Sequence, residues 1–94
     1  MLKHIVTWKM KEENKAQNMA GIKSRLEALV GVIDEIKSLQ VGINEYGGEY
    51  DIILITELGS KKDLEIYDQH PAHQEVRKYV RSVVESRIAV DFNF

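Results

Sequence analysis

The side chains best suited to chemistry in this sequence lie in one short stretch, Tyr67-Asp68-Gln69-His70-Pro71-Ala72-His73. A buried neutral imidazole titrates near or below neutrality and can take or give a proton, while a phenol can donate a hydrogen bond to a developing oxyanion. Tyr67 and His73 together therefore suit acid-base chemistry on a carbonyl compound, such as enolisation or an aldol reaction.

The spacing predicts that both side chains point toward the protein interior. His73 lies three residues before Val76, which places its ring on the buried stripe of a helix. Tyr67 follows Leu64 by three residues and leans the same way, so its hydroxyl needs a hydrogen-bond partner. His4, on the inward face of the first strand, could share this space.

A structural interpretation of the same residues is open. His73 could cap backbone groups in the first turn of its helix, His70 could lie in solvent, and Tyr67 could be a core aromatic residue with a satisfied hydroxyl. For a pattern this short, spacing alone favours the structural interpretation over catalysis.

Three helical segments are predicted. Ser60 with Asp63 three positions later indicates a helix N-terminus, and Pro71 suits the first turn of a following helix while pushing His70 out of helical geometry. An earlier helix begins at about residue 13 and ends near Gly31 and Asp34. Its apolar stripe recurs at steps of three and four residues: Met19, Ile22, Leu26, Leu29, Val30 and Ile33.

Four strands follow from alternating apolar positions in residues 2–10, 36–44 and 86–94 and from a β-branched run in residues 50–58. Gly47 and Gly48 supply the positive φ values of a tight antiparallel hairpin between the middle two. Arg87 is expected on the helix-facing side of the last strand, where it could pair with Asp91 or with an anionic ligand.

The order βαββαβ predicts an α+β, ferredoxin-like fold with a four-stranded antiparallel sheet and helices on one face. We call the other side the open face, and its predicted residues are Ile5, Thr7, Lys9, Ile53, Ile55, Ile88, Val90 and Phe92. Such a patch is too apolar to remain in water. Packing two sheets face to face about a two-fold axis would bury it, which predicts a homodimer.

Composition excludes several classes of function. With 94 residues, we expect a single domain over residues 1–94. A net charge of -2 gives no reason to bind nucleic acid or an anionic membrane. Cysteine is absent, which fits a reducing, cytoplasmic location, and the apolar start is too short and too charged for a signal or a membrane span.

Six blocks spread over nearly the whole chain resemble a known family: Lys3-His4-Ile5-Val6, Val41-Gly42-Ile43-Asn44, Tyr50-Asp51-Ile52-Ile53-Leu54, Asp63-Leu64 with Tyr67, His70-Pro71-Ala72-His73 and Val90-Asp91-Phe92. They are similar to the stress-responsive A/B barrel domain (Dabb) family of the dimeric α+β barrel group. The resemblance implies a ferredoxin-like protomer whose sheet packs against that of a second copy.

The family implied by this resemblance is functionally mixed, with stress-induced proteins of no established activity and plant polyketide cyclases. In the cyclases the tyrosine and the second histidine of the motif form the acid-base pair, which corresponds to Tyr67 and His73. A first-strand histidine at the position of His4 lines the pocket. Some members hold a divalent cation near the dimer interface, but the scattered acids here predict no metal, and we expect no cofactor.

The sequence differs from the cyclases at several pocket positions, and these differences argue against a cyclase activity. Ile52 stands where they have a histidine, Ile22 and Leu26 replace pocket aromatics, and Asp34 replaces a proline. We therefore expect first a homodimer that binds a small molecule between sheet and helices without catalysis of its own. The predicted pocket is lined by His4, Val6, Trp8, Ile22, Leu26, Ile52, Leu54 and Val84.

Two alternatives remain. The first is a cofactor-independent cyclase, isomerase or lyase acting on a small carbonyl compound, with His73 as base and Tyr67 as oxyanion donor. The second is a purely structural role, which predicts a filled interior without a cavity.

Overall fold

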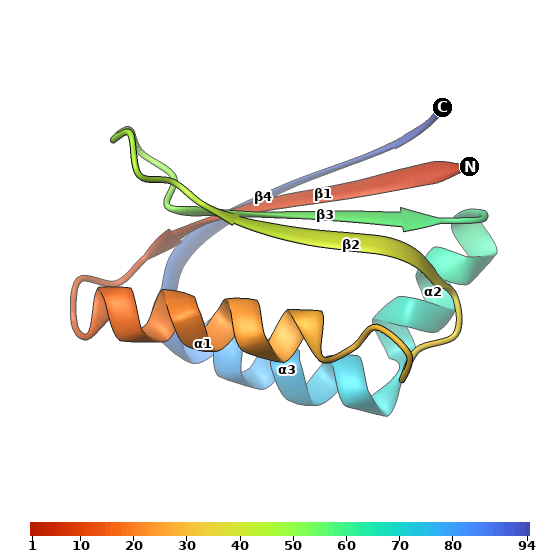
Figure 1. Cartoon of the computed structure of the whole chain (residues 1–94), viewed down its shortest axis with the longest axis horizontal. Coiled ribbons are helices and arrows are strands. Elements are labelled where there is room, and N and C mark those ends of the chain that lie inside the picture. Colours follow the sequence, from red (N-terminus) through yellow and green to blue (C-terminus); the bar gives the residue numbers. More distant parts are fainter.

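The chain follows a βαββαβ order in which the second helical segment is divided in two. The computed structural model describes residues 1–94, and its elements are β1 (Leu2–Met10), α1 (Lys15–Glu27), β2 (Ile36–Ile43), β3 (Ile52–Leu58), α2 (Lys61–Gln69), α3 (Pro71–Val83) and β4 (Val84–Asn93). The strands form one antiparallel sheet in the order β2-β3-β1-β4. The helices lie on one side of it (Figure 1). This is the predicted ferredoxin-like fold.

The register of the sheet separates an inner from an outer face as expected. Ile5 of β1 stands opposite Ile55 of β3 and Val90 of β4, so all three side chains share one face. Along β1, buried residues alternate with half-buried ones. The open face therefore carries the residues predicted for it, and Val90 is 56% and Phe92 43% exposed.

The core lies between the sheet and helices α1 and α3. From α1 it receives Ile22 and Leu26, and from α3 it receives Val76 and Val80. Each side chain of this size stabilises the fold by roughly 1.5–3 kcal/mol when it is fully buried. The valines of α3 fill less volume than the isoleucine and leucine of α1. The cavity described below lies on the α3 side of the core.

Helix α1 is shorter than predicted. It ends at Glu27 rather than near Gly31, which instead takes a left-handed φ of 86° in the following turn. Leu29 and Ile33 are buried, and the Leu29 carbonyl accepts a hydrogen bond from the Ile33 amide at 3.0 Å, whereas Val30 is exposed. Compact turns bury residues at intervals like those of a helix, so the apolar spacing overestimated the helix length.

The boundaries of β2, β3 and β4 also differ from the prediction by one or two residues. The connection between β2 and β3 spans residues 44–51, in which Gly47 and Gly48 take the expected positive φ values of 84° and 111°. The Asn44 side-chain amide donates to the carbonyls of Gly47 and Tyr50, both at 2.8 Å, and so closes the loop. Strand β4 begins at Val84, directly after α3, so the sheet edge beside the cavity is tied to that helix without a loop.

Candidate functional site

The break between α2 and α3 is capped by His70. This residue has an extended ψ of 133°, and Pro71 occupies the first turn of α3. His70 Nδ1 accepts a hydrogen bond from the Ala72 amide at 3.0 Å, so the imidazole serves as the N-cap. The structural interpretation had assigned the cap to His73 and left His70 in solvent, and both assignments are wrong. Capping by His70 leaves His73 available for another role.

His73 is buried in the first turn of α3, as its spacing predicted. Its Nδ1 lies 3.2 Å from the main-chain oxygen of Asp68, in the last turn of α2. A carbonyl oxygen only accepts hydrogen bonds, so Nδ1 carries the proton in the neutral ring and Nε2 keeps its lone pair. The helix break therefore selects the tautomer in which Nε2 is the basic atom.

Tyr67 is fully buried behind the two histidines. Its ring centroid lies 4.3 Å from that of His73 and 6.0 Å from that of His4, the latter in an edge-on arrangement. Neither the Tyr67 hydroxyl nor the buried Thr56 hydroxyl has a hydrogen-bond partner. Thr56 nevertheless lies close enough to favour the ionised phenol. The expected satisfied hydroxyl of a core tyrosine is thus not present.

His4 is held by the register of the sheet. Because β1 and β4 place His4 opposite Asp91, the Nδ1–H group of the imidazole donates to the Asp91 carboxylate. The carboxylate accepts only, so His4 in its neutral form also has its free lone pair on Nε2. The imidazole is buried while Asp91 is partly exposed. Asp91 therefore orients the histidine from the edge of the sheet.

Burial keeps the tyrosine and its neighbouring histidine neutral. Desolvation lowers the pKa of His73 below its ordinary value of 6.5, although the hydrogen bond to the Asp68 carbonyl opposes this shift. Desolvation raises the pKa of Tyr67 to about 12, with Thr56 acting in the opposite direction. At neutral pH His73 is thus an uncharged base, and Tyr67 is an uncharged donor.

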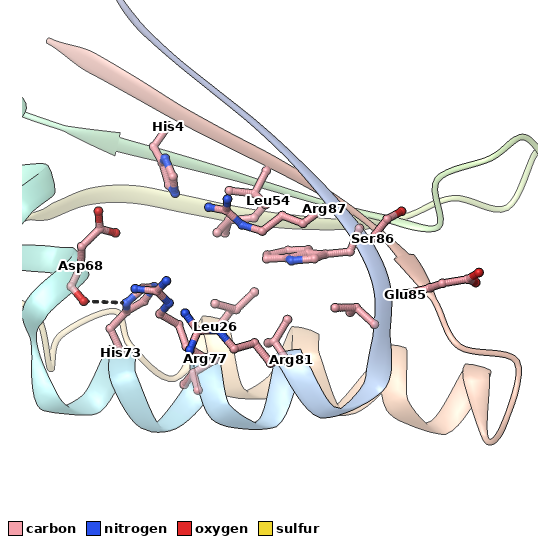
Figure 2. A pocket seen from close by; sticks show the side chains of 15 residues that line it. His4, Leu26, Leu54, Asp68, His73, Arg77, Arg81, Glu85, Ser86 and Arg87 are labelled. Atoms are coloured by element: carbon pink, nitrogen blue, oxygen red, sulfur yellow. Dashed lines mark hydrogen bonds between the residues drawn. The ribbon is translucent and has the colours of Figure 1, made fainter.

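A cavity of about 390 Å³ opens between β1, β4 and α3 (Figure 2). His4 faces it from the sheet and His73 from the helix, as Figure 2 shows. This volume falls within the range of small-molecule sites. The interior is therefore not filled, contrary to what a purely structural role predicted. Its apolar wall consists of Val6, Trp8, Leu26, Leu54, Val76, Val80 and Val84.

Six of the eight residues predicted for the pocket line this cavity, namely His4, Val6, Trp8, Leu26, Leu54 and Val84. Ile22 and Ile52 do not, because both are buried in the packed part of the core. Tyr67 is also absent from the wall, since it lies behind the ring of His73 with no exposed surface. The catalytic roles assigned to Tyr67 and His73 remain predictions.

Most of the polar wall was missed in the sequence, namely Asp68, Arg77, Arg81, Glu85 and Ser86. Arg87 lies on the helix-facing side of β4, as expected, but its proposed partner Asp91 is bonded to His4 instead. The sequence did contain a signal for two of these residues. Arg77 and Arg81 follow His73 at intervals of four residues and so lie on the same helical stripe.

The arrangement offers no obvious metal site, since no three His, Cys, Asp or Glu side chains come together. No helix of the chain combines the length and the apolar character required to cross a membrane. The charged groups on the cavity wall could instead hold the polar end of an organic ligand.

Comparison of the sequence with known families gives one match that spans nearly the whole chain. The family model described as Stress Responsive A/B Barrel Domain matches residues 2–94. No curated protein matches the sequence.

Solved structures with this fold include one from Bacteroides fragilis, described as a dimeric protein of unknown function with a ferredoxin-like fold. It is 34% identical over 99% of this chain and 95% of its own, with a TM-score of 0.92. A dimeric ferredoxin-like protein of unknown function from Thermobifida fusca is 21% identical over 99% and 90% of the two chains, with a TM-score of 0.89. The hydroxynitrile lyase of Passiflora edulis is 16% identical over 97% and 90%, with a TM-score of 0.86. At these lower identities the likeness shows the fold alone.

Proposed function

Because the chain belongs to the stress-responsive A/B barrel domain family, we propose that residues 1–94 form one domain of a homodimer that binds a small organic molecule in the cavity between the sheet and α3. The observation that carries this proposal is the cavity itself, with an apolar wall and an imidazole reaching it from each side. A cytoplasmic location stays part of the proposal and rests on the cysteine-free sequence.

The open face supports the homodimer. Ile88, Val90 and Phe92 are 49%, 56% and 43% exposed, and they lie beside the half-buried Ile5 and Ile55 on the uncovered side of the sheet. Burial of such a surface against a second copy is favourable because it removes apolar area from water. The structures from Bacteroides fragilis and Thermobifida fusca are both described as dimeric.

Ligand binding is tested by filling the cavity. The variant Val84→Phe places a larger side chain on the wall, and Val32→Phe makes the same change at an exposed turn outside it. A panel of small organic acids, ketones and alcohols is screened by NMR against the wild type and both variants. We expect compounds that shift the resonances of His4 and His73 in the wild type and in Val32→Phe but not in Val84→Phe. If no compound in the panel shifts these resonances, or if Val84→Phe binds as well as the wild type, the cavity is not the binding site.

A second candidate function is cofactor-independent proton transfer on a carbonyl compound. It is favoured by one specific observation, the 3.2 Å contact of His73 Nδ1 with the Asp68 carbonyl, from which we infer a neutral ring with its lone pair on Nε2 in a residue that lines the cavity. In this reaction Nε2 would take a proton from the carbon next to the carbonyl, leaving an enolate whose oxygen needs a donor. Tyr67 is neutral with an unpartnered hydroxyl, but that hydroxyl would reach the enolate only if the ligand opened a path past His73.

Proton transfer is measured as exchange of the α-hydrogens of a ketone in deuterated water, followed by NMR. The matched variants are His73→Ala, which removes the base, and His70→Asn, which removes the neighbouring imidazole while keeping an N-cap. We expect exchange above the buffer rate in the wild type and in His70→Asn, and none in His73→Ala. Ligand binding without exchange by the wild type would leave the first function and exclude the second.

A further inference from the structure

Three arginines converge on the cavity from two different elements. Arg77 and Arg81 lie one helical turn apart on α3, and Arg87 reaches in from β4 on the opposite side (Figure 2). Figure 2 shows the Arg87 side chain extending into the space between His4 and α3. The cavity therefore has a cationic side formed by the end of the helix and by the strand that continues directly from it.

None of these three guanidinium groups has a partner within the protein. No ion pair or side-chain hydrogen bond involves Arg77, Arg81 or Arg87. Like charges one turn apart on a helix repel each other, so Arg77 and Arg81 disfavour the helix that carries them unless something neutralises them. Their donors are free for a ligand.

The acids of the wall offset this charge only in part. Asp68 and Glu85 also line the cavity, but neither forms an ion pair with an arginine, and Figure 2 shows Glu85 directed away from the cavity. Three arginines against two acids leave one net positive charge on the wall. His73 adds none at neutral pH, since burial keeps it uncharged.

The arginines are more exposed than the other cavity residues named here, and this difference would orient a bound ligand. Arg81 and Arg87 are exposed and Arg77 is half-buried, and we call their side of the cavity its mouth. His73 and Trp8 are buried, and we call their side its floor. A planar guanidinium matches the two oxygens of a carboxylate and forms paired hydrogen bonds with it. An anionic head group would thus stay near the mouth, while an apolar body extends over the floor toward His73.

From this arrangement we propose that the cavity selects organic monoanions, with a carboxylate held by Arg77, Arg81 and Arg87 and a short apolar body against Trp8. The proposal rests on ligand binding in this cavity, as proposed above, and names the chemical class of the ligand. If His73 also acts as a base, the substrate class becomes small oxo acids, in which the carboxylate is held at the mouth and the ketone lies beside Nε2.

The test compares three probes of equal chain length: hexanoate, hexanol and hexyl phosphate. Binding is followed by NMR titration of the wild type, of Arg77→Gln and Arg87→Gln, and of the control Lys78→Gln. Lys78 is the neighbour of Arg77 on α3 but lies outside the cavity, so this variant makes the same charge change without touching the wall. The spectra themselves report whether each variant remains folded.

We expect hexanoate to bind at least about tenfold more tightly than hexanol, and each arginine variant to weaken hexanoate by at least about tenfold while Lys78→Gln does not. Tighter binding of hexyl phosphate than of hexanoate would overturn the assignment of a carboxylate. Equal binding of hexanoate and hexanol, or equal loss in Lys78→Gln and the arginine variants, would overturn the anion site while leaving a ligand-binding cavity. Absence of any shift at the cavity with all three probes would count against both proposals.

Discussion

The main-chain oxygen of Asp68 lies 3.2 Å from Nδ1 of His73, so the last turn of α2 determines which nitrogen of the histidine is basic. The contact exists because Pro71 breaks the helical segment and lets the end of one helix meet the start of the next. The same carbonyl also accepts a hydrogen bond from the Gln74 side-chain amide at 2.6 Å. In the neutral ring of His73, the lone pair is therefore on Nε2.

The lowered pKa of His73 makes stability depend on pH. The imidazole binds a proton less readily in the folded protein than in the unfolded chain. Its contribution to the free energy of unfolding is therefore complete above the ordinary pKa of 6.5 and is lost as the pH falls through the lowered pKa of the folded state. We expect the free energy of unfolding, measured by urea denaturation, to fall on acidification from about pH 8 to about pH 5. In His73→Gln this fall should be smaller. An unchanged fall in the variant would contradict the assignment to His73.

Tyr67→Phe should leave the fold nearly as stable as the wild type. The hydroxyl that it removes is buried without a hydrogen-bond partner, while the ring keeps its contacts with the two histidines. We expect a change within about 1 kcal/mol in urea denaturation. Tyr67→Ala, which removes the ring as well, should cost about 3–5 kcal/mol. A large loss in Tyr67→Phe would mean that the hydroxyl is bonded after all, most simply to Thr56.

Asp51, directly before β3, links the end of β1 and the start of α1 through its carboxylate. Its carboxylate accepts from the Met10 amide at 2.7 Å and pairs with Lys15 at 2.9 Å. Although desolvation raises its pKa, these two partners together lower the pKa below the ordinary value of 3.8. Asp51→Ala should cost about 1.5–3 kcal/mol at neutral pH.

The pH dependence of this loss gives a second check. A carboxylate with a lowered folded pKa stabilises above its unfolded value, and this contribution disappears as the pH falls through the folded value. The difference between wild type and Asp51→Ala should therefore persist at pH 5 (roughly one unit above the ordinary pKa) and shrink only below 3.8. Asp34→Ala, at an exposed acid in the turn after α1, is the matched control and should show no comparable loss.

Val90→Glu should separate the proposed dimer. Val90 lies on the open face opposite Ile5, so a glutamate there would bring a charge into the proposed apolar interface. Light scattering coupled to size-exclusion chromatography should give a dimer for the wild type and a monomer for the variant. Val32→Glu makes the same change at an exposed position outside the sheet and should remain dimeric. A monomeric wild type would refute the homodimer.

Local rules acting on neighbouring residues were sufficient to predict the elements and their faces. Ser60 caps α2 and Pro71 begins α3 through interactions within one turn, and the side chains of β1 alternate with the period that any strand imposes. The inward ring of His73 follows from the same helical spacing. Such features need only a few adjacent residues, which is why they could be read from the sequence.

The contents of the cavity depend on contacts between residues that are far apart in the chain. His4 meets Asp91 across 87 positions only because β1 pairs with β4 in one register, and Arg87 lines the same cavity as Arg77 only because α3 continues directly into that strand. Tyr67 lies behind His73, rather than beside it on the wall, because the two residues belong to separate helices that meet at the break. No periodicity encodes these distances, since they arise when separate elements share one core.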